Sequence, residues 1–382
     1  MTKYIKFSKP SIKKKEIKSV ASVLRSGWLT TGKKTKNFEE KFKKYKKAKY
    51  ALALNSCTAA IHLSLLSLNI KKGDEVITTA LTFCSTINSI IYTGAKPILV
   101  DVDLNSQNIN PSEIEKKITK KTKAIIIVHF AGKPCEMDQI TKISKKYKIH
   151  LIEDCAHAIE STYKKKHTGT FGIFGCFSFY ATKNLSIGEG GMLITNNKKL
   201  YQKARILSLH GMDKAAWNRY GSDGYRHYDV SEIGYKYNLM DLLSSIGIEQ
   251  LKKININYKI RKKIWNLYNK NFKNSNFRIP GKFNQSKFKH AYHLYNIFLN
   301  KKLNKRNRDE LILELHKRKI GVGIHYRSIP EHSIYRKLFK WKVNDYPNAK
   351  KIGRETISIP LSPSLKIKEV EKVIKVINNF TN

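Results

Sequence analysis

The sequence predicts an α/β protein in which a large domain with a mostly parallel central sheet is followed by a smaller C-terminal α/β domain. Short apolar runs alternate with helical segments through the long middle of the chain, which is typical of a parallel sheet with helices on both faces. At 382 residues the chain exceeds the length of one small core. We place the large domain at residues 1–250 and the small domain at 251–382, and leave open whether the N-terminal segment packs on the small one.

The elements of the large domain follow one another in strand–helix pairs. Short apolar runs predict strands at residues 51–54, 75–79, 97–102, 124–129 and 150–153. Longer segments with apolar residues on one side predict helices at 57–68, 85–92 and 137–147. Ligands of such sheets bind beyond the carboxyl ends of the strands. The polar clusters that fall there are Asn55 to Thr58, Thr82 with Phe83, and Asp154.

The small domain begins where the pattern changes, near residue 250. A lysine-rich helix is predicted at 252–270, and a loop rich in Pro, Gly, Asn and Ser follows at 274–286. The segment HLYNIFL at 293–299 predicts a strand, 308–318 a helix, and the chain from Lys366 onward a final helix. These elements describe a compact α/β tail.

Neither targeting nor membrane insertion is indicated. Residues 51–70 and 76–95 carry no charge, but both contain polar side chains, so buried strands and helices explain them better than membrane spans. The N-terminus has no apolar run of the signal-peptide kind. The five cysteines are odd in number and show no CxxC or metal-ligand spacing. We expect reduced thiols, no metal, no membrane and a cytoplasmic location.

The net charge of +45 raises the question of nucleic acid. Only twelve of the 74 basic residues are Arg, and the lysines are spread along the whole chain. A protein that reads bases relies more often on the bidentate fork of Arg. We therefore attribute the charge to compositional bias and expect no nucleic-acid partner. A positive field also favours an anionic substrate such as a nucleotide sugar.

Two residues point to chemistry at carbon–nitrogen bonds. Lys183 stands in SFYATKN, directly before the glycine-rich LSIGEGG, where a lysine can serve as a Schiff-base nucleophile. Asp154 follows an apolar strand-like run in LIEDCAHA. A carboxylate in that position is what the ring nitrogen of a pyridoxal phosphate cofactor needs to keep its proton. An ordinary helix N-cap is the alternative interpretation of Asp154.

These residues belong to an ordered set of segments that runs from about Gly27 to about Pro363. The segments are GWLTTG (27–32), NSCTAAIHL (55–63), GDEVITTALTF (73–83), YTGAKPILVDVD (92–103), VHFAGKPCEMD (128–138), EDCAHA (153–158), SFYATKNLSIGEGG (178–191) and GYKYNLMDL (234–242). In this order they resemble the DegT/DnrJ/EryC1/StrS family of nucleotide-sugar aminotransferases, which depend on pyridoxal 5'-phosphate (PLP). The resemblance implies the aspartate-aminotransferase-like fold, fold type I.

The resemblance also implies roles for single residues around the cofactor. Lys183 would bind the cofactor aldehyde and later carry a proton between cofactor and substrate carbons. Asp154 would hold the protonated ring nitrogen. His157 stands where the family has Gln or His near the phenolic oxygen, with a core histidine as the alternative. Phe83 would stack on the ring, with a core aromatic as the alternative.

The phosphate group would lie at the N-terminus of the helix predicted at 57–68, where backbone N–H groups favour an anion. Thr58 and Ala59 would bind it there, and Ser178 would add a hydroxyl. Cys57 departs from the family, which usually has Gly at this position, so close backbone approach is less certain there. Asn238 would reach the phosphate from the partner chain of an obligate homodimer with composite active sites.

The sugar end of the site carries weaker signals. The resemblance makes Thr30, His325, Tyr326 and Arg327 candidates for substrate binding. The segment 207–229 is rich in aromatic residues and Arg, and it reads as an extended loop that could line a nucleotide-sugar pocket.

The resemblance implies a transaminase that converts a nucleotide-linked keto sugar into the amino sugar, with glutamate as donor, for surface-polysaccharide or deoxyamino-sugar biosynthesis. The GYKYN variant and the loop 207–229 resemble most those family members that act at carbon 4 of 6-deoxy-4-keto sugars, and carbon 3 stays open. A sugar dehydratase of the same fold is one alternative, although such enzymes carry His in place of Lys183. A basic nucleic-acid-binding or regulatory protein without catalysis is the other.

Overall fold

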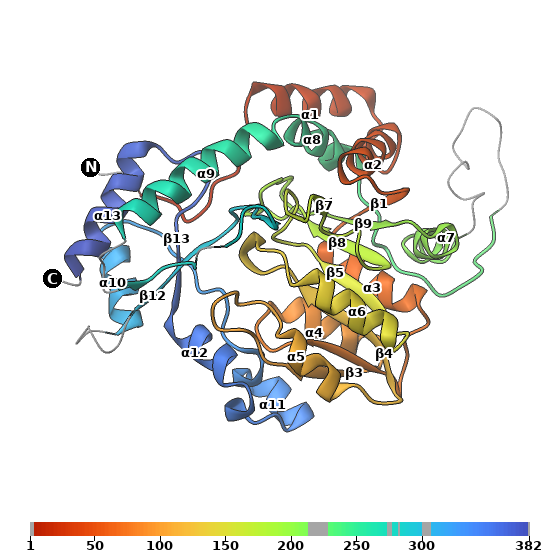
Figure 1. Cartoon of the computed structure of the whole chain (residues 1–382). Coiled ribbons are helices and arrows are strands. Elements are labelled where there is room, and N and C mark those ends of the chain that lie inside the picture. Colours follow the sequence, from red (N-terminus) through yellow and green to blue (C-terminus); the bar gives the residue numbers. More distant parts are fainter. Residues whose placement is uncertain (1–3, 213–227, 273–276, 282, 300–306, 381–382) are drawn as a thin grey trace.

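The computed structural model describes residues 4–212, 228–272, 277–281, 283–299 and 307–380 (Figure 1). Its centre is a seven-stranded sheet in the order β1-β9-β8-β5-β4-β2-β3. The strands are Tyr50–Leu54 (β1), Glu75–Thr79 (β2), Lys96–Val100 (β3), Thr122–Val128 (β4), His150–Asp154 (β5), Phe174–Ser178 (β8) and Gly191–Thr195 (β9). Only β9 runs against its neighbours β1 and β8, and the other pairs are parallel. The predicted α/β class with a mostly parallel sheet is therefore confirmed.

Helices cover both faces of this sheet, because alternate side chains of each strand point to opposite sides. On β1, Leu52 and Leu54 belong to one core, whereas Ala51 and Ala53 belong to another. The first core is closed by α3 (Cys57–Ser67), α4 (Cys84–Ile91) and α7 (Lys198–Leu207). The other face is covered by α2 (Lys33–Lys46), α5 (Pro111–Ile114), α6 (Met137–Lys146) and α8 (Asp241–Lys252), and α1 (Lys14–Ser26) packs on α8.

A second, antiparallel sheet with the order β10-β12-β13 forms the C-terminal part of the molecule (Figure 1). The elements are α9 (Ile254–Asn271), β10 (Phe277–Arg278), β12 (Tyr295–Leu299), α10 (Arg308–Lys317), α11 (Ser333–Phe339), α12 (Pro347–Glu355), β13 (Thr356–Ile359) and α13 (Ile367–Phe380). Ile5 pairs with Ile320 and lies in the core of this part, so the N-terminal segment does pack here.

Short elements complete the described chain. A three-stranded sheet is made of β11 (Phe288–Lys289), β6 (Thr162–Tyr163) and β7 (Lys166–His167). Single 3-10 turns lie at Glu115–Lys117, Phe130–Gly132, Ile329–Glu331 and Val343–Asp345. The described residues include no helix that combines the length and the apolar character needed to cross a membrane. The uncharged stretches 51–70 and 76–95 instead form β1 with α3 and β2 with α4.

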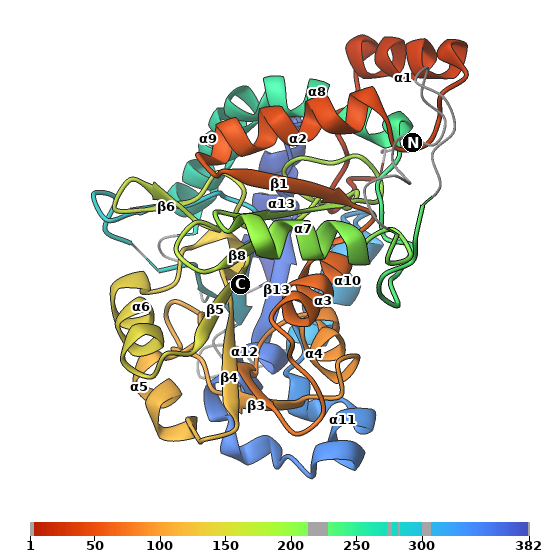
Figure 2. The same cartoon turned by 90° about the vertical axis from the view of Figure 1, so that its right-hand side faces the viewer.

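The C-terminal part is attached to the edge of the large sheet where β2 and β3 end. The carboxylate of Asp101 accepts the backbone N–H groups of Asn348 and Ala349 and so caps α12, both at 2.9 Å. The N–H of Ile329 donates to the carbonyl of Ala80 at 2.9 Å. These contacts hold the segment that joins α10 to α11 against the large sheet, and α11 and α12 lie near β3 (Figure 2).

The N-terminus of α2 depends on one buried carboxylate from the start of α8. Asp241, 3% exposed, accepts the N–H groups of Gly32 and Thr35 at 2.8 Å and that of Lys34 at 3.0 Å. The hydroxyl of Thr35 adds a fourth hydrogen bond at 2.7 Å. An anion at a helix N-terminus is stabilised by the free N–H groups and the dipole. The segments GWLTTG and GYKYNLMDL are therefore joined through this carboxylate.

We expect Asp241→Ala to lower the free energy of unfolding by about 2–3 kcal/mol, because it leaves buried donors without a partner. Urea denaturation monitored by circular dichroism measures the change. Glu40→Ala is the matched control, since that side chain on the same helix is exposed and pairs only with Lys43 at the surface. An equal loss of stability in the two variants would contradict this account.

Candidate active site

A cleft of about 490 Å³ opens at the carboxyl ends of the parallel strands. It is lined by residues of the strand-to-helix loops, of the loop between β8 and β9, and of the C-terminal part. These residues are Ser56, Cys57, Thr58, Thr82, Phe83, Ser85, Val128, Asp154, Ala156, His157, Ser178, Tyr180, Thr182, Lys183, Glu189, Gly190, His325 and Tyr326. The position agrees with the general rule for ligands of open α/β sheets.

Asp154 is the last residue of β5 and is 4% exposed. One carboxylate oxygen accepts the N–H of Ala156 at 3.0 Å, and the other accepts the hydroxyl of Thr86 at 3.1 Å. Burial raises the pKa of Asp154, while these hydrogen bonds and the nearby Lys183 amine act against the rise. No helix begins at Asp154, because β5 is followed by turns and then by β6 (Thr162–Tyr163), so its interpretation as an ordinary helix N-cap is wrong, and the carboxylate faces the cleft.

Lys183 lies in the loop that joins β8 to β9, and its backbone N–H donates to the carbonyl of Tyr180 at 2.9 Å. Burial lowers the pKa of the Lys183 amine to about 8, and the Asp154 carboxylate limits the decrease. The amine is therefore far more often unprotonated near neutral pH than that of a surface lysine. An unprotonated amine is a nucleophile, so the cleft holds a reactive nitrogen opposite a buried carboxylate.

The N-terminus of α3 forms one wall of the cleft. Ser56 caps this helix, because its hydroxyl oxygen accepts the N–H of Ala59 at 3.0 Å. The Ala59 amide is thus already engaged, and the N–H groups of Cys57 and Thr58 are the ones left at the first turn. Gly191 permits the close approach of β9, since a Cβ there would lie 2.4 Å from the Ser56 carbonyl. The cysteine at position 57 leaves this geometry intact.

His157, 5% exposed, lies between the cleft and the core. Its Nδ1 accepts the N–H of Ala131 at 3.2 Å, and its Nε2 lies 3.1 Å from the hydroxyl of Tyr326. Burial, followed by the Lys183 amine and the neighbouring histidines, lowers the pKa of His157 well below its usual value. This ring is therefore neutral, and it faces the cleft as well as the core.

The remaining predicted site residues divide into two groups. Phe83 is 55% exposed in the cleft, so its interpretation as a core aromatic is wrong. Ser178 and His325 also line the cleft. Thr30 and Arg327 are exposed and lie outside the cleft lining of their own chain.

Asn238 also lies outside the cleft of its own chain. Its amide donates to the hydroxyl of Thr31 at 2.7 Å, and its side-chain oxygen is buried without a partner in the part of the chain that the structure describes. Of the predicted loop 207–229, residues 213–227 fall outside the described part of the chain.

Several residues that line or support the cleft were not among those predicted, including Thr86, Tyr180 and Glu189. Thr86 holds the Asp154 carboxylate, and its oxygen lies 2.9 Å from the hydroxyl of Thr82. Tyr180, 46% exposed, and Glu189 line the wall near Lys183. The available signal for Thr86 was a hydroxyl in the first turn of the helix predicted at 85–92.

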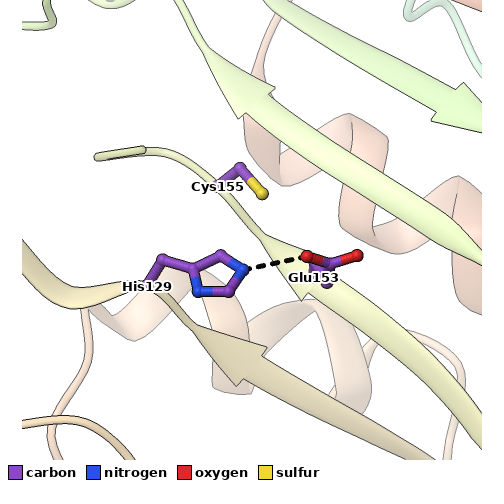
Figure 3. A group of neighbouring side chains, drawn as sticks. All are labelled: His129, Glu153 and Cys155. Carbon is purple, nitrogen blue, oxygen red and sulfur yellow. Dashed lines mark hydrogen bonds and ion pairs between the residues drawn. The ribbon is translucent and has the colours of Figure 1, made fainter. Parts of the chain in front are cut away.

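Behind Asp154, on the opposite side of β5, lie His129, Glu153 and Cys155 (Figure 3). Their spacing is compatible with a metal ion, but hydrogen bonds engage the ligand atoms of two of them. His129 accepts the N–H of Cys135 on Nδ1 at 3.0 Å and therefore donates from Nε2 to Glu153 at 3.0 Å.

Glu153 is engaged further by the loop that precedes β8. It accepts the N–H groups of Gly169, Phe171 and Gly172, each at 2.7 Å. Although burial opposes ionisation, the His129 hydrogen bond and these N–H groups lower the pKa of Glu153. The cluster thus anchors the loop to β5.

Known proteins resemble this chain over nearly its whole length. The model of the DegT/DnrJ/EryC1/StrS aminotransferase family matches residues 10–378. The spore coat polysaccharide biosynthesis protein SpsC of Bacillus subtilis is 43% identical over 381 residues, which cover 99% of this chain and 97% of SpsC.

Solved structures of aminotransferases share the fold of this chain. The PLP form of the putative sugar aminotransferase Spr1654 from Streptococcus pneumoniae has a TM-score of 0.92 at 32% identity, covering 99% of this chain and 98% of that one. The PMP form of Spr1654 gives the same values. Helicobacter pylori PseC, an aminotransferase involved in the biosynthesis of pseudoaminic acid, has a TM-score of 0.91 at 30% identity and covers 99% of both chains.

We expect Lys183→Met to stabilise the chain without cofactor at pH 7 by roughly 1–3 kcal/mol. Below the folded-state pKa of about 8, both folded and unfolded wild type are protonated, and the fold buries the charge. Between about 8 and the ordinary value of 10.5 the unfolded chain binds more protons, so wild-type stability rises with pH and the advantage of the variant shrinks. Urea denaturation at pH 7 and pH 10 measures both differences.

The control for this experiment is Lys198→Met, an exposed lysine at the start of α7, which should change stability at neither pH. A gain for Lys183→Met that is equal at the two pH values would contradict the account, because it would come from methionine packing and not from the buried charge.

Proposed function

The chain belongs to the DegT/DnrJ/EryC1/StrS aminotransferase family, and we propose that it transfers the amino group of glutamate to a nucleotide-linked 4-keto-6-deoxy sugar. The cofactor of this PLP-dependent sugar aminotransferase is pyridoxal phosphate. The observation that carries the proposal is the meeting of the Lys183 amine and the Asp154 carboxylate in one cleft. We further propose a cytoplasmic location and the partition into domains at residues 1–250 and 251–382.

The residues of the cleft fit the cofactor. The free N–H groups of Cys57 and Thr58 lie at the N-terminus of α3, where an anion such as a phosphate is favoured. The hydroxyls of Thr58 and Ser178 would add donors. Phe83, half-exposed, offers a flat face for a ring. Asp154 would receive the ring nitrogen, and Lys183 the aldehyde carbon.

When bound, pyridoxal phosphate supplies an aldehyde that takes up an amino group and a ring that withdraws electrons. Lys183 contributes the nucleophilic amine. With a pKa of about 8, this amine accepts and returns protons near neutral pH. It can therefore remove a proton from the substrate carbon and deliver one to it from the same face of the cleft.

Asp154 has to remain ionised in order to hold a proton on the ring nitrogen. Burial works against the ionisation of this carboxylate, because it raises the pKa. The Thr86 hydroxyl and the Ala156 N–H oppose that rise. Because each donates to a different carboxylate oxygen, together they also fix the orientation of the carboxylate. Thr86 is therefore a positioning residue, since it acts through Asp154.

The substrate proposal is supported from outside the cofactor pocket. The named relatives SpsC and PseC act in spore coat polysaccharide and pseudoaminic acid biosynthesis. We propose a related role here, in the formation of an amino sugar for a surface polysaccharide. The charge of +45 favours an anionic substrate such as a nucleotide sugar. A sugar dehydratase of this fold is disfavoured, because position 183 is lysine.

We also propose a homodimer in which Asn238 completes the cleft of the partner subunit. Its side-chain oxygen has no partner among the described residues, and it lies outside its own cleft. Large apolar side chains near it are exposed, among them Trp28 at 43%, Leu29 at 46% and Met240 at 43%. Exposed apolar groups gathered beside an unsatisfied polar atom are typical of a subunit interface.

We expect the wild type to release 2-oxoglutarate from glutamate when it is given nucleotide-linked 4-keto-6-deoxy sugars, and Lys183→Ala to abolish this transfer. Asp154→Asn should retain part of the cofactor and lose about 100-fold or more in rate, because a neutral ring withdraws electrons poorly. A coupled 2-oxoglutarate assay over a panel of keto sugars measures both effects. Lys198→Ala, on the surface, should keep full activity. Substantial transfer by Lys183→Ala would contradict the proposal.

Mixing two inactive variants tests the composite site. Lys183→Ala chains keep Asn238, and Asn238→Asp chains keep Lys183. A mixed dimer therefore contains one cleft in which Lys183 of one chain and Asn238 of the other are both unchanged. After co-refolding, we expect activity to return to roughly a quarter of the wild-type value, from the statistics of random pairing. A mixture as inactive as its parents would show that each chain builds its own cleft.

A further inference from the structure

Two buried hydrogen-bond chains end on the neighbouring residues His325 and Tyr326 in the wall of the cleft. Each chain begins at a backbone group that has a single possible role: an N–H can only donate and a carbonyl can only accept. The proton positions along both chains, and at the cleft surface, can therefore be assigned from the network.

The first chain fixes the hydroxyl of Tyr326. The N–H of Ala131 donates to Nδ1 of His157 at 3.2 Å, so this nitrogen carries no proton. The neutral ring must then be protonated on Nε2, which donates to the Tyr326 oxygen at 3.1 Å. The Tyr326 proton is not used in this contact and has no acceptor among the described residues. Tyr326 therefore presents a hydrogen-bond donor.

The second chain fixes the ring of His325. The side-chain amide N–H of Asn296 donates to the carbonyl of His325 at 3.3 Å, which sets the orientation of that amide. The Asn296 oxygen then accepts the hydroxyl of Ser358 at 3.2 Å, so the single proton of Ser358 is used. Nδ1 of His325, 2.8 Å from the Ser358 oxygen, must be the donor.

His325 is therefore left with an unprotonated Nε2, a hydrogen-bond acceptor. Asn296 and Ser358 are 1% and 0% exposed, so reversing the chain would leave a buried polar group unpaired. Burial, with the Lys183 amine, lowers the pKa of His325 to about 3, so this ring stays neutral in the physiological range. The rings of His325 and Tyr326 meet edge to face, with centroids 4.9 Å apart.

We propose that this fixed pair selects a keto sugar with a hydroxyl on the carbon next to the carbonyl: the Tyr326 hydroxyl donates to the carbonyl oxygen, and Nε2 of His325 accepts the neighbouring hydroxyl. The inference rests on the proposed function and specifies its substrate class. A site built to pair with a hydroxyl discriminates strongly against an analogue without it, because the site's own polar group is then left unpaired.

The first experiment measures the two tautomers without any activity. Long-range ¹H–¹⁵N correlation spectra of the apoprotein, with ¹⁵N-labelled histidine, distinguish Nδ1–H from Nε2–H rings. Loss of a peak set in His157→Gln or His325→Asn assigns the signals. We expect His157 to be protonated on Nε2 and His325 on Nδ1. The opposite tautomer at either residue would overturn the proposal, whatever reaction the enzyme catalyses.

The second experiment compares kcat/KM for a nucleotide-linked keto sugar and for its analogue deoxygenated at the carbon next to the carbonyl. We expect the wild type to prefer the hydroxylated sugar by about 10- to 100-fold. His325→Asn keeps a donor near Ser358 and removes Nε2, so it should abolish most of that preference. Tyr326→Phe should lower kcat/KM for both sugars about 10- to 100-fold and leave their ratio unchanged.

Tyr335→Phe is the control, because this buried tyrosine bonds Asn88 at 2.7 Å outside the cleft. It should change neither the rates nor their ratio. An unchanged preference in His325→Asn would overturn the proposal. So would a shift of the cofactor's visible absorption band in Tyr326→Phe, which would put this hydroxyl on the cofactor. Absence of transfer to any keto sugar, with glutamate as donor, would instead overturn the proposed function and this inference with it.

Discussion

The buried carboxylate of Asp154 is the constraint on which the rest of the site depends. Burial opposes its ionisation, so the fold has to provide donors at the end of β5. The Thr86 hydroxyl from α4 and the Ala156 N–H provide them. The preceding residue, Glu153, points to the other face, where His129 and three backbone N–H groups hold it. Two consecutive carboxylates thus point to opposite sides of β5: Asp154 lines the cleft, and Glu153 binds the loop that precedes β8.

The cleft combines parts of the chain that lie far apart in sequence. The N-terminus of α3 and the β8–β9 loop come from the large sheet, whereas the segment around Tyr326 comes from the C-terminal part. His157 connects them, because it is bonded to Ala131 on one side and to Tyr326 on the other. The Ala131 N–H fixes which nitrogen of His157 carries the proton, and so it also fixes the hydrogen-bonding role of the Tyr326 hydroxyl at the cleft surface. The hydrogen bond that positions the C-terminal segment therefore also fixes the Tyr326 hydroxyl that we propose to bind the substrate.

Much of the fold could be predicted from the sequence, because strand and helix patterns alternate clearly. The strand at 75–79 was predicted with its observed bounds, Glu75–Thr79. The strands β8 and β9 were not predicted, and the antiparallel direction of β9 depends on pairing and not on local pattern. The helix predicted at 252–270 begins at Ile254, because Lys253 ends the preceding helix, α8. The domain boundary proposed at residue 250 therefore falls near the end of α8.

In the site, the motifs identified Asp154 and Lys183, which both line the cleft, but not Thr86, whose role depends on how α4 packs against β5. The Ala59 amide was predicted to bind phosphate, yet Ser56 occupies it, and a cap of this kind is visible only in the folded helix. We propose that Asp154 keeps a proton on the ring nitrogen of the bound cofactor. ¹⁵N NMR of the enzyme loaded with ring-labelled pyridoxal phosphate tests this directly. We predict a protonated ring nitrogen in the wild type and an unprotonated one in Asp154→Asn, whereas an unprotonated nitrogen in the wild type would contradict the account.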